Sequence, residues 1–570
     1  MTQLNSITTR TAIAYFSMEI AVRPEMHTYS GGLGVLAGDT VRSCADLELG
    51  VVFVTLVNRA GYFRQKIDPD GRQIEAPDWW EPAKFCTPLD AMVAVEIEGR
   101  SVWIRPWLYI HTSSHGHEIP IVLLDTDLDH NEKDDRTLTH FLYGDGESYR
   151  LKQEIVLGIG GARLLHALGF DIRTYHLNEG HAALLTLELL NRYRIPEELL
   201  GPGIPPYDIA RVHEHCVFTT HTPVEAGYDK FSYDLFQRLL PDFVVLDELK
   251  RLAGPDKLNM TCLAFNLSGY INGVARRHAE TTKHNFPGYR IHTVTNGVHV
   301  GTWTHESFAK LYQEKFPHWQ HEPEILVRAL QLDENEIWRC HQAAKADLIS
   351  RVEEMTGVSL DPAALILGFA RRMTGYKRPL LPFSDLNRLT ALAAQHPFQI
   401  VMAGKAHPKD NEGKLAIERV HQIARELEGK LKCVFLPGYD MELAKTLVSG
   451  SDVWLNTPLP PMEASGTSGM KAALNGVLNL STMDGWWIEA CIDNVNGWAI
   501  GSGAEAGAAG DDAALLYEKL GSAVLPLYYG QTEHWRLMMK QAIGTIAYYF
   551  NSQRMMRRYA AEAYLRHSIA

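Results

Sequence analysis

The sequence predicts an α/β protein in which two doubly wound, Rossmann-like domains face each other across a cleft. Short apolar runs rich in β-branched residues recur in both halves of the chain, and each stops at a polar turn that precedes a helical pattern. Strands buried on both faces and separated by helices are typical of parallel sheets. The length of 570 residues, at roughly 150 residues per domain, favours more than one domain.

The strand-like runs form two sets. Those of the first half are VVFVTLVNRAG (51–61), TYHLNEGHAALLTLELL (174–190), CVFTTHTPVEAG (216–227) and IHTVTNGVHV (291–300). Those of the second half are LILGFARRMTGYKRP (365–379), FQIVMAGKAHPKD (398–410), KCVFLPGYDMELAKTL (432–447) and VWLNTP (453–458). Ligands of such sheets bind beyond the carboxyl ends of the strands, which is where the polar segments of both sets lie.

The amphipathic segment 326–354 lies between the two sets and is expected to connect them. We therefore expect an N-terminal domain over residues 1–340 and a second domain over residues 341–534. The stretch after residue 535 has a helical pattern rich in Met, Tyr and Arg. We expect this C-terminal helix, within residues 535–570, to pack back at the domain junction, although its arginines also suit a solvated face.

Composition excludes several classes of protein. Apolar residues make up 46% of the chain, and a net charge of -13 provides no diffuse basic field for nucleic acid. The longest apolar runs are far shorter than the roughly 20 residues that cross a bilayer, and no secretory signal is visible. The cysteines are scattered and never form a CxxC pair, as is usual in a reducing compartment. We expect a cytoplasmic protein that binds neither membrane nor nucleic acid.

The segment EASGTSGMKAALNGVL (463–478) predicts a capped helix that begins near Thr467 or Ser468. The free N–H groups of such a first turn can bind an anion, and Lys471 falls within that turn. A lysine beside a phosphate site can hold pyridoxal phosphate. From spacing alone, a capped helix with a surface lysine is the commoner arrangement.

Two further segments could bind phosphate. ARRMTGYKRP (370–379) places four cations at the carboxyl end of a strand, with a tyrosine among them, although a solvated basic loop would look the same. The glycine turn YSGGLG (29–34) lets backbone approach a ligand closely, but it is not a dinucleotide motif. The histidine-rich segments have no metal-ligand spacing, so no metal site is expected.

At these positions the chain resembles the α-glucan (glycogen, starch and maltodextrin) phosphorylases, in a short bacterial-type form. The similar segments follow that family's order over roughly residues 10–490: YSGGLGVLAGD, RLKQE, HLNEGHAAL, TTHTPVEAG, VTNGV, ARRMTGYKR and EASGTSGMKAALNGVLNLSTMDG. The resemblance implies the two-domain glycosyltransferase-B architecture, with glucan bound by the first domain and pyridoxal 5'-phosphate by the second.

The resemblance also implies roles for individual residues. The catalytic group would be Lys471, Arg372, Lys377 and His221. The cofactor group would be Lys471, which carries the cofactor, with Thr467, Gly466, Tyr439, Gly32 and Arg371, which replaces a family lysine. The substrate group would be Glu463, Ser465, Asn296, His221, Tyr376, Gly31, Gly32, Glu179 and His181.

The implied reaction is a retaining phosphorolysis of α-1,4-glucan. Inorganic phosphate would release terminal glucose as glucose 1-phosphate, and the phosphate group of the cofactor would relay protons. Two phosphates held close together repel each other, which gives the cluster of cations a physical purpose. Family members are usually homodimers, and neither nucleotide nor phosphoserine control is expected here.

This chain departs from the family pattern at several positions. Thr374 stands where the family has histidine, Gly469 replaces asparagine, and DGWWIE (484–489) replaces DGANVE. The segment before RLKQE lacks the longer loop that gates the acceptor. Two alternatives remain: a glycogen- or starch-synthase-like transferase that uses a nucleotide sugar, and a non-catalytic glucan-binding protein. Neither has a reason to place a lysine at position 471.

Overall fold

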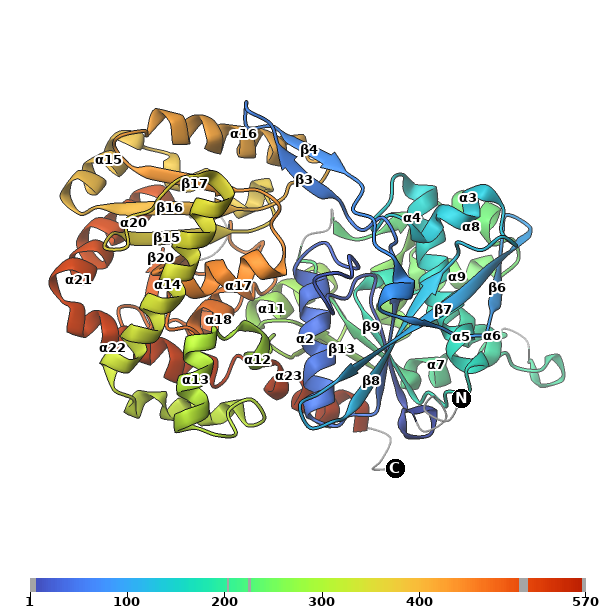
Figure 1. Ribbon diagram of the computed structural model, residues 1–570. Helices are drawn as coiled ribbons and strands as arrows, with labels where there is room; N and C mark the ends of the chain where they lie inside the picture. The colour runs from blue at the N-terminus through green and yellow to red at the C-terminus, as the bar shows by residue number, and fades with distance from the viewer. Residues whose placement is uncertain (1–6, 202–204, 224–226, 502–510, 566–570) are drawn as a thin grey trace.

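The computed structural model describes residues 7–201, 205–223, 227–501 and 511–565. It consists of two lobes, each built around one large sheet with helices packed against it (Figure 1). The α/β fold class is confirmed, and the chain has two doubly wound sheets as expected.

The sheet of the first lobe has ten strands. Its parallel part runs in the order β8 (Glu118–Asp125), β2 (Val51–Leu56), β1 (Ile13–Phe16), β9 (Thr174–Asn178), β10 (Cys216–Thr219), β13 (Tyr270–Gly273) and β14 (His292–Thr293). An antiparallel extension follows β8 and comprises β7 (Arg100–Thr112), β5 (Thr87–Pro88) and β6 (Val93–Ile97). The extension was not predicted, because its strands are partly exposed and lack a continuous apolar run.

The sheet of the second lobe has six strands, and every neighbouring pair is parallel. The order is β17 (Lys432–Leu436), β16 (Phe398–Ala403), β15 (Leu365–Ala370), β18 (Val453–Asn456), β19 (Leu478–Thr482) and β20 (Gly497–Ile500). In each lobe the order reverses beside the first strand, between β1 and β9 and between β15 and β18. Ligands of doubly wound folds bind beyond the carboxyl ends of the strands at this reversal.

Helices cover both sheets. The first lobe contains α2 (Gly32–Asp46), α3 (Lys133–Arg136), α4 (Glu147–Ile155), α5 (Gly161–Ala167), α6 (Leu185–Arg192), α7 (Ile209–His215), α8 (Tyr233–Leu239), α9 (Leu246–Ala253), α10 (Met260–Asn266) and α11 (Arg276–Asn285). The rest are α12 (Val300–Trp303), α13 (Glu306–Lys315), α14 (Glu334–Thr356), α15 (Leu386–Gln395), α16 (Asn411–Glu426), α17 (Met441–Gly450), α18 (Ser468–Ala473), α19 (Trp487–Ala490), α20 (Asp512–Lys519), α21 (Leu525–Gly530), α22 (Thr532–Ala542) and α23 (Ser552–Tyr559).

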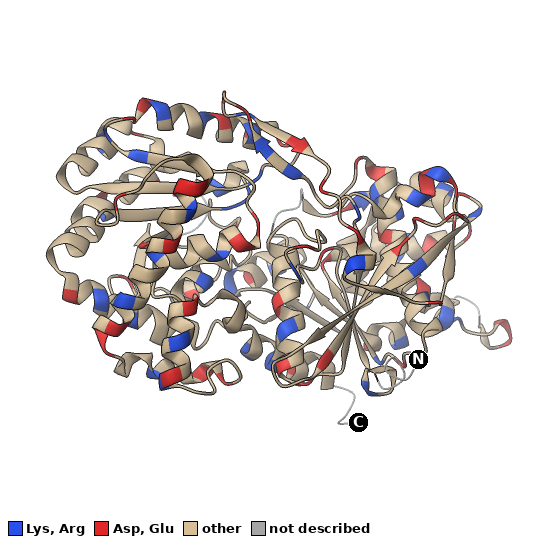
Figure 2. Ribbon diagram, viewed as in Figure 1, with Lys and Arg blue, Asp and Glu red and all other residues tan. Residues whose placement is uncertain are grey.

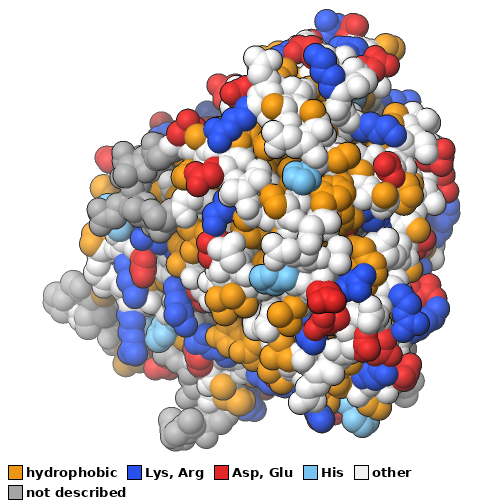
Figure 3. All heavy atoms as spheres, turned by 90° about the vertical axis from the view of Figure 1, so that its left-hand side faces the viewer, with side chains coloured by type: hydrophobic (Ala, Val, Ile, Leu, Met, Phe, Trp, Pro, Cys, Tyr) orange, Lys and Arg blue, Asp and Glu red, His pale blue; other side chains and the backbone are white. Residues whose placement is uncertain are grey.

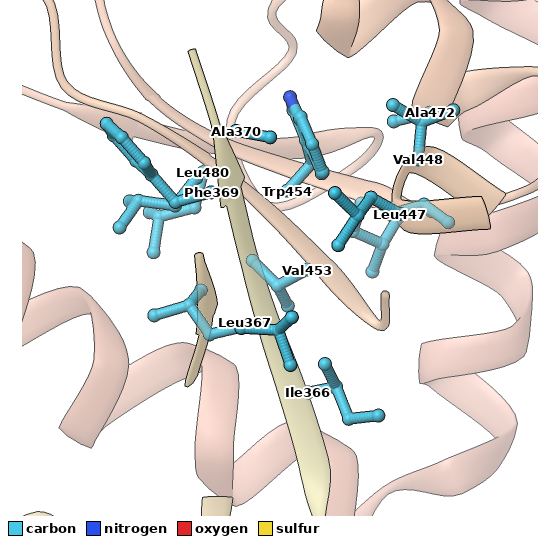
Figure 4. Packing of buried hydrophobic residues seen from close by; sticks show 14 of the residues in the cluster. Ile366, Leu367, Phe369, Ala370, Leu447, Val448, Val453, Trp454, Ala472 and Leu480 are labelled. Atoms are coloured by element: carbon cyan, nitrogen blue, oxygen red, sulfur yellow. The ribbon is translucent and has the colours of Figure 1, made fainter. Parts of the chain in front are cut away.

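The core of the second lobe lies between β15, β18 and the helices α17 and α18 (Figure 4). Ile366 and Leu367 of β15 are fully buried, as are Trp454 of β18 and Ala472 of α18. Each buried aliphatic side chain of the size of leucine contributes roughly 1.5–3 kcal/mol. This packing fixes the short helix that carries Lys471.

The two lobes exchange chain segments at their junction. Helices α13 and α14 pack in the hydrophobic core of the second lobe, and Tyr312 donates a hydrogen bond to the Leu474 carbonyl (2.7 Å). The boundary expected at residue 340 lies inside α14, and the second core already includes Val298. The C-terminal segment crosses back, because α23 packs in a first-lobe cluster and Ser552 bonds Ser43 (2.6 Å).

Acidic and basic side chains are interspersed over the ribbon and over the outer face of the second lobe, where hydrophobic side chains also reach the surface (Figures 2 and 3). Neither view shows a face of one sign. Within the described ranges, none of the helices combines the length and the apolar character needed to cross a membrane.

A buried polar network joins α14 to the second sheet. Asp452 accepts hydrogen bonds from His341 (2.8 Å) and from the Ile366 backbone N–H (2.7 Å), and it pairs with Lys345 (2.7 Å). We expect Asp452→Asn to destabilise the lobe by about 3–5 kcal/mol, because it leaves the Lys345 charge buried without its partner. Asp347→Asn is the control, since Asp347 also pairs with a histidine but is 68% exposed. Thermal unfolding should separate the two variants, and equal melting temperatures would contradict the expectation.

Candidate active site

A group of buried charges lies at the carboxyl ends of β15 and β18. Arg371 directly follows β15, and its Nη2 lies 2.9 Å from Oε2 of Glu463. Lys377 pairs with the same carboxylate oxygen. The hydrogen bonds between β15 and β16 continue past the strand ends, since the Arg371 N–H donates to the Ala403 carbonyl (3.2 Å). The Thr457 hydroxyl holds the next turn in place by donating to the Lys377 carbonyl (3.1 Å). Because Arg371 and Lys377 are buried, the predicted basic segment is not a solvated loop.

The charges shift one another's pKa values. Burial and the neighbouring Arg371 lower the pKa of Lys377 to about 7. Burial alone would raise the pKa of Glu463, but Arg371 and Lys377 outweigh burial and hold that pKa below its usual value. Nη1 of Arg371 is buried without a hydrogen-bond partner among the described residues. The cluster therefore retains a strong donor for an anion.

The turn after β19 supports this cluster, and sequence reasoning missed it. Asp484 accepts hydrogen bonds from the backbone N–H groups of Glu463 and Gly485, both at 2.8 Å. The Trp486 N–H donates to the Ser465 carbonyl (3.0 Å). Burial raises the pKa of Asp484 to about 7. The turn clamps the backbone from Glu463 to Ser465, and the position of Asp484 beyond a strand end was the signal that could have found it.

Lys471 lies in α18 with its Nζ 3.8 Å from the ring centroid of Trp303. Burial lowers the pKa of this amine to about 8. In the part of the chain that the structure describes, no carboxylate lies within 4 Å of it. The Asp39 carboxylate opposes this lowering without forming an ion pair with the amine. A buried amine of lowered pKa that contacts no carboxylate is suited to act as a nucleophile toward a carbonyl group.

Two departures from the family pattern contact each other beside Lys471. A Cβ placed on Gly469 would lie 2.2 Å from Oδ1 of Asn479 and 2.7 Å from the Trp486 ring. Only glycine fits there while Trp486 occupies its position. The glycine in GTSGMK and Trp486 in DGWWIE are therefore packed against each other.

The glycine turn of the first lobe faces the second lobe. Gly31 is the N-cap of α2, and its N–H donates to Glu19 Oε2 (3.1 Å); Tyr143 donates to the other oxygen of the same carboxylate (2.7 Å). A Cβ on Gly31 would lie 3.6 Å from Nη2 of Arg372, whereas Gly32 borders open space. The exposed Arg372 guanidinium thus lies opposite the N-terminus of a long helix, an arrangement that suits an anion.

A second group lies at the carboxyl ends of β9 and β10 in the first lobe. His221 Nε2 hydrogen-bonds Oδ1 of Asn178 (2.6 Å), and the His221 backbone N–H donates to Glu179 (2.7 Å). Burial lowers the pKa of His221 to about 3, so the ring is neutral. Because an amide oxygen only accepts, Nε2 carries the proton and Nδ1 is an acceptor. His181 lies 3.6 Å from Asp229.

The remaining predicted residues lie around the charge cluster or at the junction. Gly466 has a φ of +75° and lies beside Arg371 and Glu463, and Thr467 is the N-cap of α18. The Lys377 ammonium lies 4.6 Å from the Tyr376 ring centroid. The charge of Arg371 acts on the Tyr439 hydroxyl group, and burial raises the pKa of Tyr439 to about 12. Oγ of Ser465 and Oδ1 of Asn296 are both buried without described hydrogen-bond partners.

The structure therefore brings Arg371, Lys377, Glu463, Ser465 and Gly466 together. His221, Glu179 and His181 form a separate first-lobe group, to which Tyr143 is linked by its ring contact with His181. Within the described residues, no group of three His, Cys, Asp or Glu side chains could hold a metal ion.

Comparison with known proteins identifies the family. The model of the carbohydrate phosphorylases matches residues 170–505. The chain is 37% identical to a maltodextrin phosphorylase of Thermococcus litoralis, over 97% of this chain and 70% of that protein. It is 36% identical to a glycogen phosphorylase of Mycobacterium tuberculosis (97% and 71%) and 33% identical to one of Aquifex aeolicus (97% and 86%). This chain belongs to the carbohydrate phosphorylase family.

Proposed function

We propose that the protein is an α-1,4-glucan phosphorylase, a glycosyltransferase that releases terminal glucose from glycogen or maltodextrin as glucose 1-phosphate. The observation that carries this proposal is that the second lobe buries both a cation cluster, Arg371 and Lys377, and the amine of Lys471, which contacts Trp303. The names of the relatives support the same activity, and they give no support to a nucleotide-sugar synthase. A non-catalytic glucan-binding protein would not need buried cations.

The residues fit pyridoxal 5'-phosphate as the cofactor. Lys471 offers an amine of lowered pKa for the aldehyde, and the unpaired Nη1 of Arg371 offers a donor for the phosphate. Thr467 and Gly466 lie between them in the chain, and Gly466 supplies a turn of positive φ without a side chain. When bound, the cofactor would supply a phosphate group that exchanges protons with the substrate phosphate.

The substrate groups can be assigned in the same way. Arg372 and Lys377 would hold inorganic phosphate against the backbone of Gly31 and Gly32. The acceptor Nδ1 of His221 would accept a hydrogen bond from a glucose hydroxyl, and the Ser465 hydroxyl would donate a hydrogen bond to another. Glu463 is occupied by Arg371 and Lys377, and Glu179 by backbone donors, so neither is free to act as a carboxylate nucleophile. We therefore expect phosphate to protonate the leaving glycosidic oxygen and then to attack the oxocarbenium-like carbon from the same face, so that configuration is retained.

Incubation of the purified chain with maltodextrin and inorganic phosphate tests this proposal. We expect glucose 1-phosphate to form without any nucleotide sugar. Transfer that depends on UDP- or ADP-glucose would instead support the synthase, and glucan binding without product would support the non-catalytic protein. A homodimer, a cytoplasmic location and the lack of nucleotide or phosphoserine control stay predictions from the sequence.

The lowered pKa of Lys377 predicts a pH dependence. Below about pH 7 its ammonium is charged and attracts phosphate, and as pH rises through about 7 that charge is lost. The kcat/KM for phosphate should then fall by up to about tenfold per pH unit. Lys377→Arg keeps the positive charge, so its kcat/KM for phosphate should fall less steeply above about pH 7. The titration of phosphate itself affects the wild type and the variant equally. Identical pH profiles for the two proteins would contradict the assignment.

A further inference from the structure

A buried carboxylate at the junction of the lobes has no role in the assignments above. Asp39 lies in α2, which runs along the junction next to α12 (Figure 1), and it is 1% exposed. Its Oδ2 accepts a hydrogen bond from Nε1 of Trp303 in α12 (2.8 Å). The other oxygen, Oδ1, is buried and accepts no hydrogen bond from the described residues. A buried acceptor of this kind costs free energy, which a ligand that donates to it would recover.

Arg42 does not supply the missing donor. Its Nη1 lies 3.6 Å from Oδ1 of Asp39, which is close enough for an ion pair but too far for a hydrogen bond. The guanidinium donates instead to the carbonyls of Ala21 (3.4 Å) and Val22 (2.8 Å). Arg42 therefore pairs with the charge of Asp39 and leaves Oδ1 able to accept a hydrogen bond.

The carboxylate is a neighbour of the amine that would carry the cofactor, and Trp303 connects the two. Asp39 bonds the N–H at the edge of the indole ring, while Nζ of Lys471 lies 3.8 Å from the centroid of the same ring. Burial lowers the pKa of Lys471, and the charge of Asp39 acts against this lowering without forming an ion pair. The two groups are therefore close enough to interact, although they do not contact each other.

The structure of pyridoxal phosphate places a hydrogen-bond donor opposite its aldehyde. The aldehyde carbon, to which Lys471 would be joined, and the ring nitrogen stand on opposite sides of the pyridine ring. A cofactor held by Lys471 therefore presents its ring nitrogen on the side that faces away from the amine. When protonated, this nitrogen is a cationic N–H donor, and a carboxylate is a common partner for it in proteins that use this cofactor.

Helix α2 relates the carboxylate to the glycine turn. Asp39 follows Gly32 by seven residues, which is two turns of helix, so both positions lie on one face of α2. The N-terminal end of this face is assigned to phosphate, and Asp39 lies roughly 10 Å further along the helix axis. One helix face thus carries phosphate-binding backbone at its start and a buried carboxylate near the cofactor lysine.

We propose that Asp39 binds the ring nitrogen of pyridoxal 5'-phosphate, with Oδ1 accepting a hydrogen bond from the protonated nitrogen. This inference rests on the proposed function, because it takes Lys471 to carry the cofactor. Asp39 would then fix the orientation of the ring, and with it the direction of the arm that carries the cofactor's phosphate.

The deaza analogue of pyridoxal 5'-phosphate, in which a C–H group replaces the ring nitrogen, tests the proposal. Each compound is titrated into the full chain after removal of its cofactor, and binding is followed by absorbance and tryptophan fluorescence, neither of which needs catalysis. Asp39→Asn keeps an oxygen for Trp303 but loses the charge. We expect the preference of the wild type for pyridoxal phosphate over the analogue to fall about tenfold to a hundredfold in this variant.

Asp46→Asn is the matched control. Asp46 ends the same helix, seven residues after Asp39, and bonds His299 (2.9 Å) and Gln553 (3.0 Å) instead of Trp303. Its preference between the two compounds should equal that of the wild type. If Asp39→Asn weakened the binding of both compounds equally, Asp39 would act only by holding Trp303, and the proposal would be overturned.

A cofactor with an isotope-labelled ring nitrogen gives a second measurement, on the wild type alone. Nitrogen NMR of the holoenzyme should show a protonated ring nitrogen, and an unprotonated one would overturn the proposal even if Asp39→Asn did not fold. A wild type that binds neither compound would refute the proposed cofactor together with this inference, whereas an unchanged preference in Asp39→Asn overturns this inference alone.

Discussion

Lys471→Ala should abolish phosphorolysis while the second lobe stays folded. The side chain contributes a contact with Trp303 and no described ion pair, and alanine is the best helix former for its place in α18. The packing of the adjacent Ala472 and Met470, both fully buried, is unchanged. We expect kcat/KM to fall by at least about three orders of magnitude.

The same variant has a readout that does not depend on activity. After borohydride reduction of the wild type, mass spectrometry should find a phosphopyridoxyl adduct on the peptide that contains Lys471, and the variant should lack it. Lys445→Ala is the control, because Lys445 lies on the exposed side of α17 and pairs with Glu442 (2.8 Å). Full activity of wild-type protein that contains no vitamin B6 would refute both the residue assignment and the cofactor.

The parallel strands could be predicted because burial on both faces leaves a continuous apolar run. VVFVTL and LILGFA became β2 and β15, and every residue of both strands is buried. The hairpin of β3 (Arg64–Ile67) and β4 (Gln73–Ala76) could not be predicted in this way. Its Gln65 and Gln73 look like solvated residues, yet they bond the second-lobe carbonyls of Gly404 (2.8 Å) and Ala406 (2.9 Å). Such contacts depend on how the lobes meet, which local patterns do not encode.

The candidate site likewise contains some residues that could be predicted from the sequence and others that could not. Arg371 and Lys377 could be predicted, because the cations cluster in sequence and follow a strand. Glu19 and Asp484 were missed, because each acts on backbone N–H groups far along the chain and belongs to no charge cluster. Their placement beyond β1 and β19 follows the same rule that located the cations.

The boundary expected at residue 340 stays a prediction, although that residue lies inside α14. The amphipathic segment 326–354 suggested a connector, since its pattern shows an apolar face and a polar face. In the structure that apolar face packs on α17 and the second sheet, with Ile337 and Leu348 fully buried. Amphipathicity shows that a helix has a partner but does not identify it.

The structure also gives different contacts to Arg372 and Arg378, two arginines of the basic segment, and this difference predicts a second large effect on catalysis. Arg378 uses its donors on the Thr457 and Pro458 carbonyls (2.8 and 2.9 Å) and on Asp512 (2.7 Å). Arg372 instead projects toward the glycine turn, 3.6 Å from where a Cβ of Gly31 would lie. The first arginine therefore holds the loop, and the second is available to substrate phosphate.

Arg372→Ala should lower kcat/KM for phosphate by about 10²–10³-fold, because it removes a planar donor for the charge that develops on the phosphate in the transition state. Arg372→Lys should recover part of this loss, since it keeps the charge without the paired N–H donors. Both variants should still yield the phosphopyridoxyl adduct at Lys471. Arg378→Ala, assayed below its melting temperature, should lose stability yet keep its kcat/KM for phosphate within a few fold. An equal loss of kcat/KM for phosphate in Arg378→Ala and Arg372→Ala would contradict this assignment. The position of Arg372 opposite the glycine turn would then not contribute to catalysis, and the phosphate site could not be assigned to this edge of the cleft.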